Sequence, residues 1–400
     1  RYWRPYYQTK RAPCDAHCPV GNRVVDYIQT VLEGDWTEAA TILRSENPLP
    51  AVTGRLCHRP CEANCNRRQY DQRISIHDVE RVLAEVDYRP LVFPEIQEPK
   101  DVAVIGSGPA QLAFAHFMTS LNHDVTIFDP REGLGGELRY GARTRRLPGG
   151  LLDAEVARIV DRGVDVVRRG VKPVALLNEF DVVFGAEPDS DTVALHLSDG
   201  EVPSRDWDSD LSAWFAADGS LQSGKAATSP LISEAIGFGK WAALLVDAGW
   251  RGLDPQETMG QIAVGGANRV LSAGKYSVIL AEGELTRSEE IVTYDKLNLD
   301  MLEPQVAVTP QMVEQGEAHI EPQFAEAGDA ELVLHEAARC FSCGRCNDCA
   351  NCWVFCPDGV VLREDGVYDI DYDYCKGCRI CAAVCPRYVI SVIEEEEWNG

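Results

Sequence analysis

The sequence carries one cysteine pattern twice near its end, as CNDCANCWVFCP at residues 346–357 and as CKGCRICAAVCP at residues 375–386. Both copies have the spacing C-x2-C-x2-C-x3-C-P, which groups three thiols and sets a fourth apart. In bacterial proteins with two [4Fe-4S] clusters, this fourth cysteine ligates the cluster of the other copy. Zinc also binds C-x2-C pairs, but a tetrahedral zinc site needs only two such pairs. Zinc would therefore not explain why a group of three closely spaced cysteines occurs twice. The repeat therefore predicts two [4Fe-4S] clusters.

The crossed arrangement predicts which cysteines hold each of these two clusters. One cluster takes Cys346, Cys349, Cys352 and Cys385. Its neighbour takes Cys375, Cys378, Cys381 and Cys356. The stretch NCWVFCPDGVVLREDGVYDIDYDYCKGC, residues 351–378, resembles the delta subunit of 2-oxoacid:ferredoxin oxidoreductases. This resemblance implies a bacterial two-cluster ferredoxin fold that carries electrons at low potential.

Composition and charge exclude several classes of protein. The 400 residues include 15 cysteines in two groups, at 14–65 and 340–385, with 274 cysteine-free residues between them. An odd number of cysteines, clustered in a long chain, argues against disulfides and for bound metal. The formal charge of −25 removes the long-range attraction to nucleic acid and anionic lipid. Because no signal-peptide pattern or long apolar run occurs, we expect a cytoplasmic protein with no nucleic-acid partner and no membrane insertion.

Periodicity divides the rest of the chain into helical and α/β parts. Residues 21–47 read as two helices separated at Gly34 and Asp35, and a third helix is expected from about 76 to 86. From residue 100 the pattern becomes strand, Gly-rich turn, helix and strand, which is a βαβ unit. Further helices are expected at 151–162 and 230–247, and further strands near 165–168, 181–184 and 192–197.

Five cysteines near the start have a different spacing, C-x3-C-P and then C-x3-C-x3-C. They are Cys14, Cys18, Cys57, Cys61 and Cys65. The segment that holds them, residues 12–66, begins APCDAHCPVGN and ends RLCHRPCEANCN. It resembles the N-terminal iron–sulfur domain of the glutamate synthase small subunit and of dihydropyrimidine dehydrogenase. The resemblance implies two [4Fe-4S] clusters with eight ligands, which is more than these cysteines provide.

Two of the missing ligands are expected from the far end of the chain. The family pattern begins with an R-C-x2-C pair, and residues 1–13 contain no cysteine. An isolated R-C-x2-C-G, with Cys340 and Cys343, occurs instead just before the ferredoxin run, where these thiols are surplus. We infer that Cys340 and Cys343 fold back and complete the cluster held by Cys14 and Cys65.

The other N-terminal cluster needs one ligand besides Cys18, Cys57 and Cys61. In the family, a carboxylate or carboxamide on the following helix supplies it, and RISIHDVERVL aligns Glu80 with that position. Glu80 also borders the apolar stripe of this helix, where an unpaired carboxylate is costly. An ordinary half-exposed glutamate is the alternative, and His77 is another candidate ligand. Fifteen cysteines and one glutamate would ligate four [4Fe-4S] clusters with no thiol left over.

A dinucleotide fingerprint lies in the α/β part. Gly106 and Gly108 follow a predicted strand and open a helix, and Asp129 ends the next strand. Such glycines let backbone N–H groups approach a pyrophosphate, and such an acid binds a ribose hydroxyl. Gln111 stands where the fingerprint has Gly or Ala. The continuation GGELRYGARTRRLPGGLLDAEV resembles the flavin segment of the glutamate synthase family and implies bound FAD. Its family positions include Gly135, Gly136, Leu138 and Arg146.

The flavin segment also departs from the family pattern. Residues 141–143 read Gly-Ala-Arg in place of Gly-Ile-Pro. Residues 217–219 read Ala-Asp-Gly in place of Ala-Gly-Asp, whose acid, here Asp218, contacts the flavin ribityl chain in the family. The interval from Gly106 to Asp218 contains no second glycine fingerprint, so we find no NAD(P) site and expect the nicotinamide domain to be deleted. A relic fold that binds no flavin is the alternative.

These expectations define a multidomain α+β and α/β fold class. We expect an α-helical [4Fe-4S] domain at 1–90, a reduced Rossmann-like FAD-binding domain at 91–250, a connecting segment at 251–335 and a two-[4Fe-4S] ferredoxin domain at 336–400.

The expected function is electron transfer within a larger anaerobic oxidoreductase. Four [4Fe-4S] clusters would pass electrons between FAD and the catalytic subunit of the complex, such as a 2-oxoacid oxidoreductase, with a soluble ferredoxin as a further partner. We expect no catalytic residue in the chain itself, since every cysteine is used as a ligand. The alternatives are an NAD(P)H:acceptor oxidoreductase of the glutamate synthase small-subunit type and a non-catalytic iron–sulfur scaffold.

Overall fold

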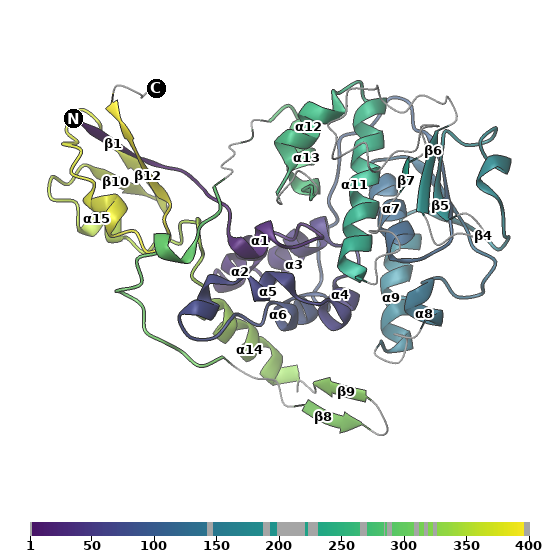
Figure 1. The fold of residues 1–400 in the computed structure, drawn as a ribbon, viewed down its shortest axis with the longest axis horizontal. Helices are drawn as coiled ribbons and strands as arrows, with labels where there is room; N and C mark the ends of the chain where they lie inside the picture. Colours follow the sequence, from purple (N-terminus) through teal and green to yellow (C-terminus); the bar gives the residue numbers. More distant parts are fainter. Residues whose placement is uncertain are drawn as a thin grey trace.

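The computed structural model shows three connected parts (Figure 1). It describes residues 2–141, 147–186, 193–197, 221–222, 231–264, 270–283, 285, 290–307, 312–315, 319–322 and 326–395. A small lobe contains both the first and the last strand of the chain, a group of short helices lies in the middle, and an α/β part lies at the opposite end. The fold class is therefore mixed α/β with several domains, in agreement with the sequence.

The central part is built from short helices. They are α1 (Pro13–Ala16), α2 (Val24–Leu32), α3 (Trp36–Glu46), α4 (Pro50–Leu56), α5 (Pro60–Ala63), the 3-10 helix η1 (Asn66–Gln69) and α6 (Ile76–Leu83). The predicted break between α2 and α3 is confirmed: Gly34 has φ +88°, and the Asp35 carboxylate accepts a hydrogen bond of 2.8 Å from Glu38 N. The predicted third helix is α6. Helix α14 (Glu326–Arg339), far along the chain, packs against α2 and α6.

The α/β part is a six-stranded sheet with the order β4-β3-β2-β5-β6-β7. Its strands are β2 (Asp101–Ile105), β3 (Asp124–Phe128), β4 (Asp165–Val167), β5 (Val182–Ala186), β6 (Val193–Leu197) and β7 (Leu221–Gln222). The first four strands in that order are parallel, and the β5-β6-β7 edge is antiparallel. The predicted βαβ unit is confirmed as β2, α7 (Pro109–Ser120) and β3. Helices α8 (Glu137–Tyr140) and α9 (Gly149–Val160) and the 3-10 helix η3 (Pro173–Ala175) complete the described elements before β5.

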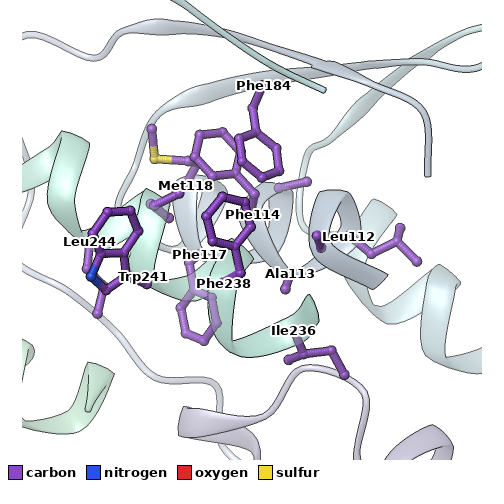
Figure 2. Packing of buried hydrophobic residues seen from close by; sticks show 14 of the residues in the cluster. Leu112, Ala113, Phe114, Phe117, Met118, Phe184, Ile236, Phe238, Trp241 and Leu244 are labelled. Atoms are coloured by element: carbon purple, nitrogen blue, oxygen red, sulfur yellow. The ribbon is translucent and has the colours of Figure 1, made fainter. Parts of the chain in front are cut away.

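The main apolar core lies between α7, β5 and the long helix α11 (Ile232–Trp250) (Figure 2). The ring of Phe114 stacks on Phe184 with centroids 4.2 Å apart. Gly239 of α11 lies so close to α7 that a Cβ there would be 2.2 Å from the Ala110 carbonyl oxygen. The absence of a side chain at Gly239 therefore sets how closely these two helices approach each other. Helix α11 is the helix predicted near 230–247.

The connecting segment contains small elements that the sequence did not predict. They are α12 (Pro255–Ile262), α13 (Ala273–Leu280), the 3-10 helix η5 (Tyr294–Lys296), β8 (Met312–Gln315) and β9 (His319–Pro322). A buried glutamate links this segment to the other parts: Glu46 Oε2 on α3 lies 2.7 Å from Lys240 Nζ on α11. Glu46 also accepts hydrogen bonds from the first two N–H groups of α13, at Ala273 and Gly274.

The small lobe joins the two ends of the chain. Strand β1 (Trp3–Tyr7) pairs antiparallel with β12 (Ile390–Glu394), with Tyr7 opposite Ile390. The lobe also contains the hairpin β10 (Val361–Glu364) and β11 (Val367–Ile370) and the single-turn helices α15 (Asn351–Val354) and α16 (Ile380–Ala383). Residues 3–7 thus lie beside the C-terminal cysteines, which the sequence did not predict. In the described part of the chain, no helix is both long and apolar enough to span a membrane.

Candidate metal centres

The first group of cysteines lies in the small lobe, next to strand β1. Cys346, Cys349, Cys352 and Cys385 line one hollow with an empty volume of about 330 Å³. We call these four residues the inner set. Cys385 comes from the second sequence repeat and the other three from the first, which is the predicted crossing. The Tyr7 hydroxyl donates a hydrogen bond of 3.3 Å to Cys352 Sγ.

The second group has the complementary composition. Cys356, Cys375, Cys378 and Cys381 line a second hollow of about 330 Å³. We call these residues the outer set. Burial raises the pKa of the Cys356 thiol, but the backbone N–H groups of residues 358–361 outweigh this effect and lower it below its usual value. This turn therefore favours the thiolate, which is the form that binds metal.

The third group joins cysteines from opposite ends of the chain. Cys14, Cys65, Cys340 and Cys343 line a hollow of about 360 Å³. We call these residues the junction set. Asn66 Nδ2 lies 3.4 Å from Cys343 Sγ and donates to it, and helix α14 ends directly before Cys340. The structure thus brings together the four cysteines that the sequence assigned to one cluster.

Packing of α14 holds the two late cysteines in this position. The Arg339 side chain at the end of α14 is fully buried and forms an ion pair of 2.8 Å with Glu336. It also donates to the carbonyl oxygen of Gln72, and Arg67 donates to the carbonyl oxygen of Arg339. These bonds fix the chain leading to Cys340 against the segment that follows Cys65.

The fourth group contains the predicted carboxylate. Its members are Cys18, Cys57, Cys61 and Glu80, which we call the glutamate set. Burial, and secondly the nearby Glu80 carboxylate, raise the pKa of the Cys18 thiol to about 12. The Glu80 charge also raises the pKa values of the Cys57 and Cys61 thiols, which burial raises most. Helix α4, which ends directly before Cys57, packs on α6, which contains Glu80, so the structure places Glu80 near the thiols, as expected from the sequence.

The Glu80 side chain is buried and oriented by two hydrogen bonds. Asn22 Nδ2 donates at 2.7 Å and the Tyr27 hydroxyl at 2.9 Å, both to Oε1. No hydrogen bond from a described residue to Oε2 is found, so this oxygen is free to ligate a metal. The ordinary half-exposed glutamate that the sequence left open is excluded, because Glu80 is only 6% exposed.

His77, the other candidate ligand, is oriented away from this role. Its Nδ1 lies 2.7 Å from Glu62 Oε1, and its Nε2 lies 3.3 Å from Asp78 Oδ1. Both ring nitrogens therefore face carboxylates, which favours a structural role for this histidine.

The donor chemistry of the four sets fits polynuclear clusters better than single ions. Four thiolates around one zinc ion would lie about 4 Å apart. Within the described ranges, no three His, Cys, Asp or Glu side chains converge closely enough to hold a single metal ion. Burial raises the pKa values of most of these thiols, for example of Cys340 to about 11, so their thiolates need a metal cation nearby. A [4Fe-4S] cluster supplies that positive charge and a one-electron carrier.

The dinucleotide turn has the backbone geometry that the fingerprint requires. Gly106 has φ +86°, and Gly108 is the N-cap of α7, whose first turn has no side-chain cap. Gly136 lies directly on this turn, because a Cβ there would be 2.7 Å from the Gly108 Cα. Gly135 has φ +127°, and Leu138 is buried in the core beside it. The backbone of the turn therefore has the conformation that a pyrophosphate site requires, but the Gln111 carboxamide lies over it, because a Cβ at Gly108 would be 2.8 Å from Gln111 Oε1.

Asp129, in contrast, is not available to bind a ribose hydroxyl. Its carboxylate is fully buried and accepts hydrogen bonds from the Ser107 hydroxyl at 2.5 Å, from Arg131 N at 3.0 Å, from Arg131 Nε at 2.9 Å and from Arg131 Nη2 at 2.8 Å. A carboxylate has about four acceptor positions, and all are used here. A ribose hydroxyl could bind only if Arg131 moved. Arg146 and Asp218, the other predicted flavin contacts, lie outside the described residues.

Sequence reasoning missed two residues that lie beside the cysteines. Tyr7 was missed because its approach to Cys352 depends on the pairing of β1 with β12. Ser233 of α11 was missed because it lies far from Cys57 in sequence. Its buried hydroxyl has no fully formed hydrogen bond among the described residues, but it lies near enough to lower the burial-raised pKa of the Cys57 thiol. No local pattern in the sequence signals either contact.

Three family models match parts of this chain. Residues 6–90 match the model for dihydropyrimidine dehydrogenase domain II with a 4Fe-4S cluster. Residues 104–172 match the model for an NAD(P)-binding Rossmann-like domain. Residues 368–391 match the model for a 4Fe-4S binding domain. The matches support 4Fe-4S domains in the N-terminal and C-terminal regions, and the middle match does not distinguish FAD from NAD(P).

Curated relatives are similar to less than half of the chain. The NADPH-Fe(3+) oxidoreductase subunit beta of Geobacter sulfurreducens is 32% identical over 184 residues, which is 43% of this chain and 27% of that protein. The glutamate synthase [NADPH] small chain of Bacillus subtilis is 33% identical over 42% of this chain and 36% of its own length. The NADP(+)-dependent formate dehydrogenase subunit beta of Moorella thermoacetica is 30% identical over 43% of this chain and 29% of its own length.

This chain therefore aligns with only about a third of each relative's length. The predicted resemblance to iron–sulfur oxidoreductases of the glutamate synthase small-chain type is confirmed over the matched segments. The names of the relatives describe subunits or chains of oxidoreductases.

Proposed function

We propose that this chain is an electron-transfer subunit that conducts electrons through four [4Fe-4S] clusters in a line. The proposal rests on one observation: cysteines that are only three or four residues apart in the sequence belong to different sets. Where two such cysteines ligate different clusters, the short chain between them keeps those clusters adjacent.

Single helical turns make the links within each half of the line. Cys14 and Cys18 connect the junction and glutamate sets through α1, and Cys61 and Cys65 connect the same sets through α5. Helices α15 and α16 connect the inner and outer sets in the same way, between Cys352 and Cys356 and between Cys381 and Cys385. Four residues of α-helix rise only about 6 Å, so the clusters in each pair would be neighbours.

The middle link joins the two halves of the protein. Cys343 belongs to the junction set and Cys346 to the inner set. Three residues of chain span at most about 11 Å. The order of the four sets is therefore glutamate, junction, inner, outer. The line runs from the central helices to the small lobe, away from the six-stranded sheet (Figure 1).

The first centre in this line contacts the α/β part. Gly237 of α11 lies against the loop that holds Cys18, because a Cβ at Gly237 would be 2.1 Å from the Pro19 carbonyl oxygen. The same helix packs on α7, which starts at the dinucleotide turn. A bound dinucleotide would therefore be connected to the glutamate set through two packed helices, α7 and α11. FAD is our proposed ligand of that turn, with Gly106, Gly108, Gly135, Gly136 and Leu138 as the described residues that form its site.

The last centre in the line is open to a partner. Cys378 is exposed, and so are the side chains of Tyr374 and Ile380 beside it. We propose that a catalytic subunit of an oxidoreductase complex, such as a 2-oxoacid oxidoreductase, or a soluble ferredoxin exchanges electrons here. We also propose that the protein works in the cytoplasm, with helical iron–sulfur, Rossmann-like and ferredoxin domains near the predicted boundaries.

A second candidate function follows from the match to an NAD(P)-binding domain and from relatives whose names include NADPH or NADP(+). In this alternative the chain itself accepts electrons from NAD(P)H. Anaerobic reduction of the purified chain by NADPH or NADH, followed by absorbance, distinguishes the two: reduction by either nucleotide supports the alternative, and no reduction supports the electron-transfer subunit.

Iron and sulfide quantification on anaerobically purified protein tests the main proposal. Four clusters require about sixteen irons per chain. A Cys340→Ser variant should lose about four of them, from the junction set, and keep the electron paramagnetic resonance signals of the inner and outer sets. About twelve irons or fewer in the unaltered protein would contradict the scheme of four clusters.

A further inference from the structure

Arg387 is a buried arginine that forms no ion pair with any acidic residue in the described part of the chain. It follows Cys385 and Pro386, and it is only 9% exposed. Its Nε is buried without a hydrogen bond, and no ion pair or hydrogen bond of its guanidinium with another described residue is found. Other buried arginines in the central part differ in this respect: Arg44 pairs with Glu155 at 2.9 Å, and Arg67 pairs with Asp71 at 2.5 Å.

An isolated buried cation is unfavourable. Moving a charge out of water is costly unless an opposite charge lies nearby. Arginine does not avoid this cost by losing its proton, because its guanidinium stays protonated in proteins. This chain has 63 acidic residues, yet none of the described ones forms an ion pair with Arg387. An anion other than a side-chain carboxylate is therefore expected beside it.

The position of Arg387 indicates which anion this is. The residue lines the hollow of the inner set. Its carbonyl oxygen accepts a hydrogen bond of 2.8 Å from Gly344 N, and Gly344 lies between Cys343 of the junction set and Cys346 of the inner set. Gly344 directly follows Cys343, so this backbone hydrogen bond also holds Arg387 next to the junction set.

We propose that Arg387 is the shared counter-cation of the junction and inner clusters. This inference rests on the proposed function, since it requires clusters in both sets. Four thiolates outweigh the positive charge of a [4Fe-4S] core, so each loaded centre is an anion that gains further negative charge on reduction. A fixed guanidinium between two such centres stabilises the reduced form of both.

The consequence is that electrons can pass between the clusters in the two halves of the chain. Net charge near a cluster is one of the properties that set its reduction potential. A cation shared by both centres raises both potentials together and keeps them close. When one electron leaves one of the two clusters, it reduces the other. The guanidinium keeps its proton throughout, so the step moves one electron and no proton.

The test is a redox titration of the purified full-length chain, followed by electron paramagnetic resonance. In Arg387→Gln, two of the four clusters should become harder to reduce. At a fixed solution potential, the ratio of reduced to oxidised cluster should fall on the order of tenfold for each of the two. For a one-electron couple, this corresponds to a reduction potential that is more negative by about 59 mV. Arg387→Lys keeps the charge and should retain most of both potentials. Arg89→Gln removes an equal charge from an exposed position and should shift no cluster.

Iron content separates failure of this inference from failure of the proposed function. About twelve irons or fewer in the unaltered protein contradict the four clusters themselves. With all four clusters present, unchanged potentials in Arg387→Gln, or a shift of only one cluster, would overturn the shared cation. If Arg387→Gln loses iron, Arg387→Lys decides: retained clusters and potentials support the role of the charge, and an equal loss in Arg387→Lys overturns it.

Discussion

The hydroxyl of Tyr7 donates a hydrogen bond of 3.3 Å to the sulfur of Cys352, although the two residues are 345 positions apart. The bond exists because strand β1 joins the sheet edge next to the inner set. A donor to a ligand sulfur stabilises the more negative, reduced form of a cluster. Tyr7, near the start of the sequence, therefore forms part of the environment of a cysteine near its other end.

Tyr7→Phe should make the inner cluster harder to reduce. The variant removes one hydrogen bond to a charged sulfur and keeps the ring. The reduced form should therefore lose on the order of 1 kcal/mol of stabilisation relative to the oxidised form. Redox titration measures this as a more negative potential for one cluster. Tyr6→Phe on the same strand is the control and should leave all potentials unchanged. A shift of equal size in both variants would contradict the role of the hydrogen bond.

Glu80→Ala should remove one cluster, because the glutamate set would lose its only ligand that is not cysteine. We expect about four fewer irons per chain and the loss of one set of electron paramagnetic resonance signals. Glu80→Gln should retain the cluster, since a carboxamide oxygen can replace the carboxylate. Glu85→Ala removes a mostly exposed glutamate from the same region and serves as control. Full iron content in Glu80→Ala would show that Glu80 is not a ligand.

Gly237→Ala should loosen the contact between α11 and the loop that holds Cys18. The added Cβ would lie 2.1 Å from the Pro19 carbonyl oxygen, so one of the two segments must move. Overpacking of this kind costs about 1–3 kcal/mol. Thermal unfolding followed by tryptophan fluorescence should show a lower midpoint than in the unaltered protein.

Gly260→Ala is the matched control for this variant. Gly260 also lies in a helix, but a Cβ there meets no atom within 4 Å. Alanine is favoured over glycine inside helices by roughly 0.5–1 kcal/mol, so this variant should be neutral or slightly more stable. Equal midpoints for Gly237→Ala and Gly260→Ala would show that the close approach at Pro19 does not limit stability.

His116 should contribute to acid sensitivity. Burial, and secondly the charges of Arg162 and Arg44, lower its pKa to about 3, so the histidine stays neutral in the folded protein. The unfolded chain binds a proton below about pH 6.5, and stability therefore falls as the pH falls from about 6.5 toward 3. Between pH 7 and pH 5 the expected loss is about 2 kcal/mol.

The measurement is the unfolding midpoint in urea at pH 7 and at pH 5. His116→Leu cannot be protonated, so its midpoint should change less between the two pH values than that of the unaltered protein. The control is His335→Leu, at a side chain that is 40% exposed, which should keep the original pH dependence. The same pH dependence in His116→Leu as in the unaltered protein would assign the acid sensitivity to other groups.

Arg131→Ala should strengthen FAD binding if the Asp129 carboxylate is a ribose acceptor. The variant releases the two acceptor positions now used by the Arg131 side chain. One new hydrogen bond of about 1 kcal/mol corresponds to roughly fivefold tighter binding. Flavin fluorescence titration measures the Kd, with Arg158→Ala as a control of equal charge loss. Weaker binding in Arg131→Ala would show that the arginine itself contacts the flavin.

Local spacing of residues along the chain determines much of the candidate site. The predicted ligands of the inner and outer sets follow from two short runs of sequence, because cysteines separated by two or three residues cannot lie far apart. The helix break at Gly34 and the βαβ unit around Gly106 are local in the same sense. The junction set also follows from the sequence, but only by counting thiols against the pattern of a family.

Contacts between distant segments were decided only by the tertiary structure. The pairing of β1 with β12 has no local signal, since a short strand pairs with whichever edge the rest of the fold presents. The saturation of Asp129 by Arg131 and Ser107 depends on side-chain orientation, which the fingerprint does not encode. Arg387 reads as an ordinary surface arginine in the sequence. Only the three-dimensional arrangement shows that it is buried beside the inner set and that no described carboxylate forms an ion pair with it.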